Sequence, residues 1–150
     1  MKKFIVFFIL CCFLFTASLF KKEFDFSIYD NLNVQIFTQG KELESYGSVM
    51  VTDNGNGQII SCTYADYKTL SASLKNVSGI TFIFTGDKDT YLDCISRLNV
   101  KVVEDGETDF LGYTNYFGGG VCAYDKKVNV QGYFDGEKIY IGTPLLLGSY

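Results

Sequence analysis

The C-terminal stretch from Lys127 to Tyr150 most constrains the fold, because it has the pattern of two paired strands. Asp135-Gly136 separates two runs of alternating residues, and this pair readily adopts the positive φ values of a tight hairpin turn. Pairing about the turn places Val128, Val130, Gly132, Ile139 and Ile141 on one face and Gln131, Tyr133, Lys138 and Tyr140 on the other. Pro144, the only proline, ends the second strand because it has no N–H to donate.

A helix and further strands are predicted before this hairpin. Residues 80–85 form a short apolar strand, and residues 87–99 carry Tyr91, Ile95 and Leu98 at helical spacing. Acidic residues begin this helix, where the helix dipole favours them. Strands follow over residues 100–104 and 110–117, with the acidic run at 104–109 as an exposed turn between them. The glycines at 118–120 predict a loop or bulge before the hairpin.

The first half of the chain offers strands and then a helix. Alternation of Leu32, Val34 and Ile36 with polar residues within 24–38 predicts a strand with one buried face. Residues 48–51 and 58–62 flank turn-forming residues at 53–57, which predicts a hairpin. A helix is predicted over 65–76, with Thr63 and Asp66 as its capping box. The fold class is therefore α+β: one domain over 21–150, an antiparallel sheet with two helices packed on one face.

Residues 1–20 have the layout of a signal peptide or a membrane anchor. Two lysines precede a uniformly apolar run, and small residues near its end make a cut after Ser18 plausible. The run is also long enough, at the lower limit, to span a bilayer. A buried N-terminal core helix is the third interpretation. Both of the first two interpretations place the rest of the chain outside the cytoplasm, secreted or anchored by this segment.

Charge and the absence of histidine exclude several classes of function. Four of the 13 basic residues flank the apolar run, so nine remain from Glu23 onward against all 17 acidic residues, a net charge of −8. Such a charge disfavours nucleic acid and anionic membrane as partners. The chain has no histidine. Ser-His-Asp and Cys-His catalysis and the commonest zinc sites are therefore excluded.

Motifs in the C-terminal half resemble the YwmB family. They are Phe110-Leu-Gly-Tyr-Thr114, Lys127-x-Asn129-Val130 and Ile139-x-Ile141-Gly-Thr-Pro-Leu-Leu146 with a closing Tyr150. The resemblance covers residues 80–150. It implies a secreted or membrane-attached protein of a Gram-positive bacterium with no established activity. It also implies a fold like the TATA-box-binding protein, whose two halves each pack a helix on an antiparallel sheet.

The region before the resemblance, residues 24–77, is short for a full first half. We therefore expect one such half or a shortened double. DNA binding does not follow from this likeness, because a DNA-gripping saddle needs a basic concave face. This chain has a single arginine, Arg97, and a strongly negative domain.

Residues that commonly bind metals or catalyse reactions form no recognisable motif. The acidic residues at 87, 89 and 93 lack EF-hand spacing, and the run at 53–57 is typical of a turn. The cysteines beyond the leader are either all free or include one disulfide: Cys62, Cys94 and Cys122. We predict no catalytic residue, no metal site and no cofactor.

Tyr113, Tyr133 and Tyr140 are the candidate interaction residues, because they could form a tyrosine-rich sheet face that no helix covers. Tyrosine also suits half-exposed strands for packing alone. We predict a non-enzymatic cell-envelope module that binds an unknown envelope protein through this face and meets the membrane only through its N-terminal segment. The alternative is a small carboxylate-dependent envelope hydrolase or glycan-acting protein, since the 17 acidic residues supply many carboxyl pairs.

Overall fold

The computed structural model describes residues 23–44, 47–55 and 57–146, so the predicted leader at 1–20 lies outside the described part. The helical elements are η1 (Phe26–Ile28), α2 (Tyr64–Leu70) and α3 (Lys88–Arg97). The strands are β1 (Asn33–Gln39), β2 (Met50–Asn54), β3 (Gly57–Thr63), β4 (Val77–Thr85), β5 (Lys101–Asp105), β6 (Asp109–Tyr113), β7 (Val121–Ala123), β8 (Lys126–Val128), β9 (Val130–Phe134) and β10 (Lys138–Thr143). Within these ranges no helix has the length and apolarity needed to cross a bilayer.

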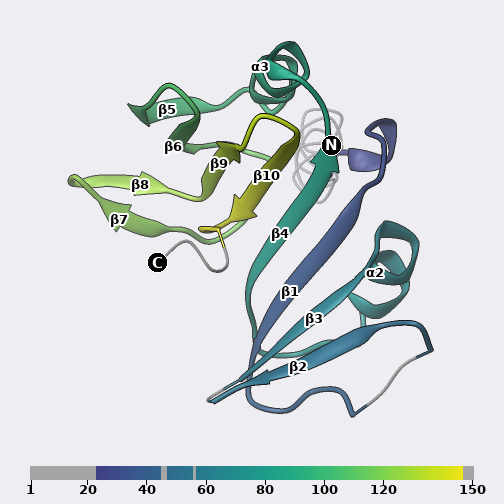
Figure 1. The fold of residues 1–150 in the computed structure, drawn as a ribbon. Helices are drawn as coiled ribbons and strands as arrows, with labels where there is room; N and C mark the ends of the chain where they lie inside the picture. Colours follow the sequence, from purple (N-terminus) through teal and green to yellow (C-terminus); the bar gives the residue numbers. More distant parts are fainter. Residues whose placement is uncertain (1–22, 45–46, 56, 147–150) are drawn as a thin grey trace, which may run out of the picture.

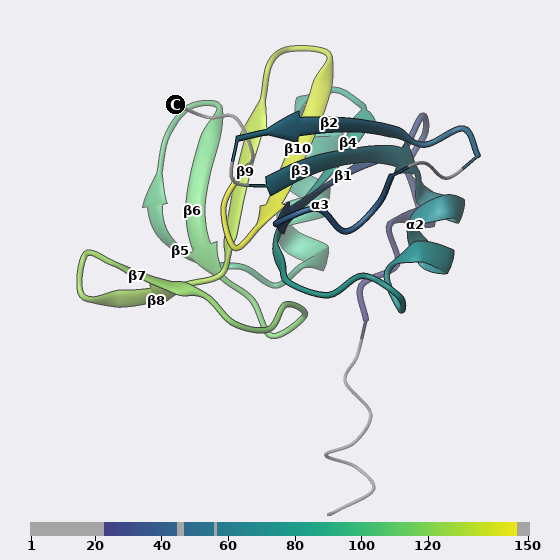
Figure 2. The ribbon, with the colours of Figure 1, turned by 90° about the horizontal axis from the view of Figure 1, so that it is seen from below.

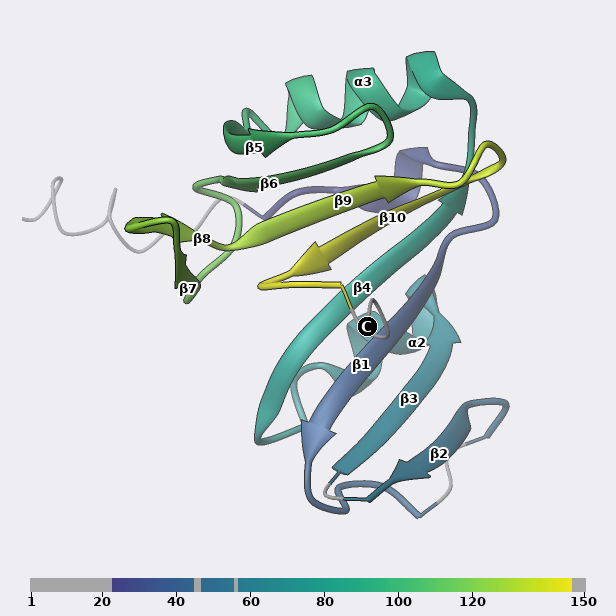
Figure 3. The same cartoon turned by 60° about the vertical axis from the view of Figure 1, so that its left-hand side comes forward.

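Eight strands form one antiparallel sheet in the order β2-β3-β1-β4-β10-β9-β6-β5 (Figure 1). The strands fan out along a strongly twisted sheet, with α3 alongside its β9–β6–β5 end and α2 behind β1 and β3 (Figure 3). β7 and β8 pair only with each other in a hairpin that extends away from the sheet in two views (Figures 1 and 2). The predicted α+β class is confirmed.

Both helices pack on the same face of the sheet, which holds the core. Phe82 of β4 lies directly opposite Ile141 of β10, so the two side chains share a face. From α2, the Tyr67 ring meets Phe82 edge to face at 5.6 Å. From α3, the Tyr91 ring stacks at 5.8 Å on Phe134 of β9. We call this side of the sheet the helix face. The predicted packing of two helices on one face of the sheet is confirmed.

Two strand-helix units meet at the pair β1–β4. The second unit contributes β4, β5, β6, β9 and β10 to the sheet, with α3 after β4. The predicted strand, helix and four sheet strands from Ile80 onward are present, but the hairpin β7–β8 interrupts the four strands, which were predicted to follow one another directly. The first unit has three strands, in the sheet order β2-β3-β1, and its helix α2 follows the last of them in sequence. The first unit is therefore smaller and differently ordered.

The strand predicted over 24–38 begins later, because its first residues fill the core instead. Asp25 accepts a hydrogen bond from the Ser27 N–H (3.0 Å) and begins the short helix η1. η1 carries Phe26 over the sheet, where its ring stacks on Phe82 at 4.0 Å between centroids. The strand β1 starts at Asn33 and buries alternate residues as predicted.

Helix α2 ends at Leu70, six residues before the end that the sequence predicts, although its start is confirmed. Thr63 Oγ1 accepts from the Asp66 N–H (3.2 Å) and donates to the Asp66 carboxylate (2.8 Å). After α2, Asn76 adopts φ +51° and its carbonyl accepts the Gln39 N–H at 3.0 Å. Pairing of β4 with β1 from Val77 onward therefore outweighs helix propensity in this segment.

The strand predicted from Lys127 onward is broken at Asn129, and the end of the strand predicted over 110–117 is a loop. The fully buried Asn129 amide accepts the Thr114 N–H and donates to the carbonyls of Thr114 and Phe117, each at 2.8 Å. β7 and β8, which the sequence analysis missed, turn at Tyr124 and Asp125 with φ of 51° and 58°. These positive angles suit a type I′ hairpin.

Candidate functional site

The three tyrosines predicted to form an interaction face lie on the side of the sheet opposite the helices. Tyr133 of β9 lies directly opposite both Tyr140 of β10 and Asp109 of β6. Tyr113 shares this side of β6, because it follows Asp109 by four positions and side chains alternate along a strand. We call the surface around Tyr113, Tyr133 and Tyr140 the open face. The helices do not bury these three side chains together.

The structure brings two of the three tyrosines into contact. The rings of Tyr133 and Tyr140 lie 5.8 Å apart between centroids with planes inclined by 35°, and Tyr133 is 41% exposed. Tyr113 stands about 13 Å further along the strands, at roughly 3.3 Å per residue. Its ring faces the Lys127 ammonium at 5.8 Å instead. The open face therefore has one ring pair and one separate ring.

The hairpin loop between β9 and β10 positions the ring pair. One carboxylate oxygen of Asp135 accepts the N–H groups of Glu137 (2.9 Å) and Lys138 (2.7 Å), and the other accepts the Tyr140 hydroxyl at 3.0 Å. The hydrogen bonds from the backbone of Lys138 and Glu137 lower the pKa of Asp135. Burial, and then the bond to Asp135, raises the pKa of Tyr140, so its hydroxyl stays a donor.

The chain after Pro144 covers part of the open face, which the sequence analysis missed. The Leu146 N–H donates to Gln131 Oε1 at 3.1 Å, and Leu146 is buried. Gly142 permits this close approach, because a Cβ on it would lie 2.6 Å from backbone atoms of Leu145 and Leu146. Gly142 of β10 lies opposite Gln131 of β9, at the ends of these two strands that are far from the loop joining them. The part of the open face around Gln131 and Gly142 is therefore covered, and the part around Tyr133 and Tyr140 is left for a partner to contact.

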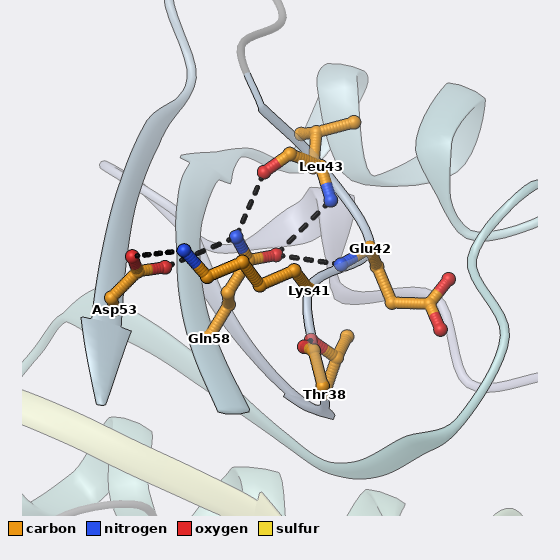
Figure 4. A network of polar contacts seen from close by, with 7 residues as sticks. Thr38, Lys41, Glu42, Leu43, Asp53 and Gln58 are labelled. Atoms are coloured by element: carbon orange, nitrogen blue, oxygen red, sulfur yellow. Dashed lines mark hydrogen bonds and ion pairs between the residues drawn. The ribbon is translucent and has the colours of Figure 1, made fainter. Parts of the chain in front are cut away.

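A polar network around the buried Gln58 side chain has a structural explanation (Figure 4). Its carbonyl accepts the N–H groups of Glu42 (2.8 Å) and Leu43 (3.0 Å), and its NH₂ group donates to Leu43 O (2.9 Å) and Asp53 (3.2 Å). Lys41 pairs with the same Asp53 carboxylate at 3.1 Å. The amide is fully used in fixing the segment after β1, so it has no capacity left to bind a ligand.

Two of the carboxylates weighed as metal ligands, Asp87 and Asp93, have local partners. Asp87 caps α3 by accepting the Thr90 N–H at 2.9 Å, and hydrogen bonds from Thr90 lower its pKa. Asp93 pairs with Arg97 at 2.6 Å. A lowered pKa favours the ionised form, the opposite of what a general acid needs. Across the described ranges, no three acidic or cysteine side chains gather as metal ligands would.

The three cysteines beyond the leader are all free, which decides between the two predicted alternatives. Burial raises the pKa of Cys94 to about 12 and that of Cys62 to about 11. Both therefore stay thiols at neutral pH and are poor nucleophiles. Cys122 is exposed on β7.

No family model, curated protein or solved structure matches this chain. The resemblance to the YwmB family and the extracytoplasmic location therefore stay predictions. The geometry of the described residues is what supports a function.

Proposed function

We propose that this protein is a non-enzymatic module of the cell envelope that binds a protein partner on its open face. In this proposal residues 1–20 take the chain out of the cytoplasm, as a cleaved signal or as an anchor. The YwmB-like motifs and the apolar leader support the location. The Tyr133–Tyr140 pair supports the binding role.

The observation that carries the proposal is an exposed ring pair that is already held in place. Tyrosine contributes a large contact area with few rotatable bonds, which is why it is enriched at protein interfaces. Asp135 fixes the Tyr140 hydroxyl, and the Tyr140 ring contacts Tyr133. Little side-chain freedom therefore remains to be lost when a partner covers the pair.

Charges of both signs surround the ring pair. Lys138 begins β10 on the same face, and Asp109 lies directly opposite Tyr133 on the neighbouring strand. An aromatic centre inside a polar rim is the usual arrangement of a protein–protein interface. The net charge of −8 after the leader favours a partner whose contacting surface is neutral or basic.

A photoreactive amino acid at position 133 of the full-length chain tests the proposal in intact cells. Position 92 is the matched control, since Leu92 is 51% exposed on α3, on the other side of the sheet. A covalent adduct with one protein from position 133, and not from 92, supports the proposal. No adduct at 133, or the same adducts at both positions, refutes it. An adduct with glycan alone assigns the protein to the glycan-acting class instead.

Binding to the purified partner then measures the contribution of the ring. Tyr133→Ala is expected to weaken binding about tenfold, which corresponds to roughly 1.4 kcal/mol and is more than most interface residues contribute. Tyr133→Phe keeps the ring and should weaken binding far less. Equal dissociation constants for the wild type and the alanine variant would contradict a role for the ring pair.

A further inference from the structure

A cavity of about 560 Å³ lies on the helix face, away from the open face. It is bounded by residues just before η1, by α2, by β4 and by the loop that follows β6. Its volume falls within the range of small-molecule sites, roughly 300–1,000 Å³. We call it the aromatic cavity, after the aromatic residues that line it, among them Tyr64, Tyr67, Phe82, Tyr116 and Phe117.

The rings at the wall of the cavity also pack against one another. Tyr67 and Tyr64 both meet Phe82 with their planes steeply inclined, at 89° and 68°. Tyr116 and Phe117, in the loop after β6, are only half-buried. The face of an aromatic ring carries negative electrostatic potential and attracts cations.

The charge at the wall of the cavity is negative, like the electrostatic potential of an aromatic ring face. Glu23 is the only charged residue among the described residues at the wall, and none of them is lysine or arginine. The Glu23 carboxylate acts on the wall itself, since it adds to the effect of burial in raising the pKa of Tyr67. None of the described residues at this wall carries a positive charge that would neutralise a bound anion. A cation is therefore the favoured ligand.

One ring of the wall already attracts a cation from the chain. The exposed Lys68 places its ammonium 4.8 Å from the centroid of the Tyr64 ring, although Lys68 does not line the cavity. The lysine lies four residues after the tyrosine, one turn further along α2. Its charge opposes a second cation nearby, which makes it a useful position for a test.

We propose that the aromatic cavity binds a small organic cation of the quaternary ammonium or protonated amine class. The apolar part of the ligand packs against the rings, and its charge lies toward Glu23. This site is independent of the proposed function, because it lies on the other face of the sheet from the Tyr133–Tyr140 pair.

Choline and its uncharged isostere 3,3-dimethylbutan-1-ol are the probes, titrated into the full-length chain with binding followed by NMR. Choline should bind at least about fivefold more tightly, as expected for a desolvated cation–π contact. Equal affinity of the two probes, or no binding of either, would overturn the proposal. Sedimentation with phosphatidylcholine vesicles then distinguishes a lipid headgroup from a free ammonium compound as the source of the cation.

Two charge variants should move the choline affinity in opposite directions. Glu23→Gln should lower it and Lys68→Gln should raise it, because both side chains are exposed and neither supports the core. Tyr67→Leu should lower the affinity and Tyr67→Phe should keep it, which separates the ring from its hydroxyl. Tyr133→Ala on the open face should leave choline binding unchanged. A choline affinity of Glu23→Gln equal to that of the wild type would refute the role of Glu23.

Discussion

Asn129 controls the loop that follows β6, and replacing it tests how the fold shapes the wall of the aromatic cavity. Its fully buried amide makes three hydrogen bonds of 2.8 Å, one from the Thr114 N–H and one each to the carbonyls of Thr114 and Phe117. Asn129→Ala removes all three. Two buried backbone groups of Thr114 and the partly buried carbonyl of Phe117 then lose their side-chain partner.

The expected loss follows from the cost of these groups. A buried polar group left without a partner costs about 1–3 kcal/mol, and the low end applies here because the loop can relax toward water. Three groups therefore predict a loss of about 3 kcal/mol in the free energy of unfolding. Asn115→Ala, at an exposed position of the same loop, should change it by less than about 0.5 kcal/mol.

Urea unfolding followed by tyrosine near-ultraviolet circular dichroism measures both variants, since the chain has no tryptophan. The transition midpoint should fall for Asn129→Ala while the dependence on urea stays constant. Asn129→Asp keeps the acceptor for the Thr114 N–H but turns a carboxylate oxygen toward two carbonyl oxygens in a buried site, so its loss should be at least as large as that of the alanine variant. A loss below about 1 kcal/mol for the alanine variant would refute the assigned role of the amide.

Three further measurements test other parts of the fold. Gly132→Ala should lose about 1–3 kcal/mol, because a Cβ there overlaps the Phe110 ring on the neighbouring strand. Phe110→Leu in the same chain should recover part of that loss in thermal unfolding, and simple additivity would contradict the overlap. Thr63→Ala should lose about 1 kcal/mol in urea unfolding with the cap of α2. Thr69→Ala, exposed in the same helix, should be neutral or slightly stabilising, and equal losses would contradict the cap. Stability should fall as the pH rises from 9.0 toward 12, because burial raises the pKa of Cys94 from 9.0 to about 12 and the unfolded thiol ionises first. Cys94→Ala should reduce the slope of Tm against pH in this range, and an unchanged slope would contradict the coupling.

Local sequence patterns were sufficient to predict those elements whose conformation depends only on their own residues. The hairpin around Asp135-Gly136 and the helix begun by Asp87 need only turn chemistry, capping and period, and both are confirmed. The same period places Tyr133 and Tyr140 on one face, so the open face follows from the sequence once the helix face is known.

Competition between elements was not visible in the sequence. The end of α2 is decided by β4, which takes residues from Val77 onward into the sheet. The break at Asn129 is decided by carbonyls twelve and fifteen residues away that need a buried donor. The sequence pattern near the end of α2 does not indicate pairing with β4, and the pattern around Asn129 does not indicate the distant carbonyls.

The aromatic cavity could not be predicted from the sequence. Tyr64 has the helical period of α2, and Tyr116 lies in the loop after β6, so neither is distinguished in the sequence from an ordinary packing residue. Only the fold places them at one wall with Glu23.

The sequence by itself determined the α+β class, the order of the second unit and the alternation that separates the two faces of the sheet. These depend on residue period and turn chemistry, which act over a few neighbours. The tertiary structure alone decided where α2 ends, how the segment after Pro144 covers part of the open face, and which rings meet in the cavity. These depend on contacts between residues far apart in the chain, whose geometry exists only after the sheet has formed.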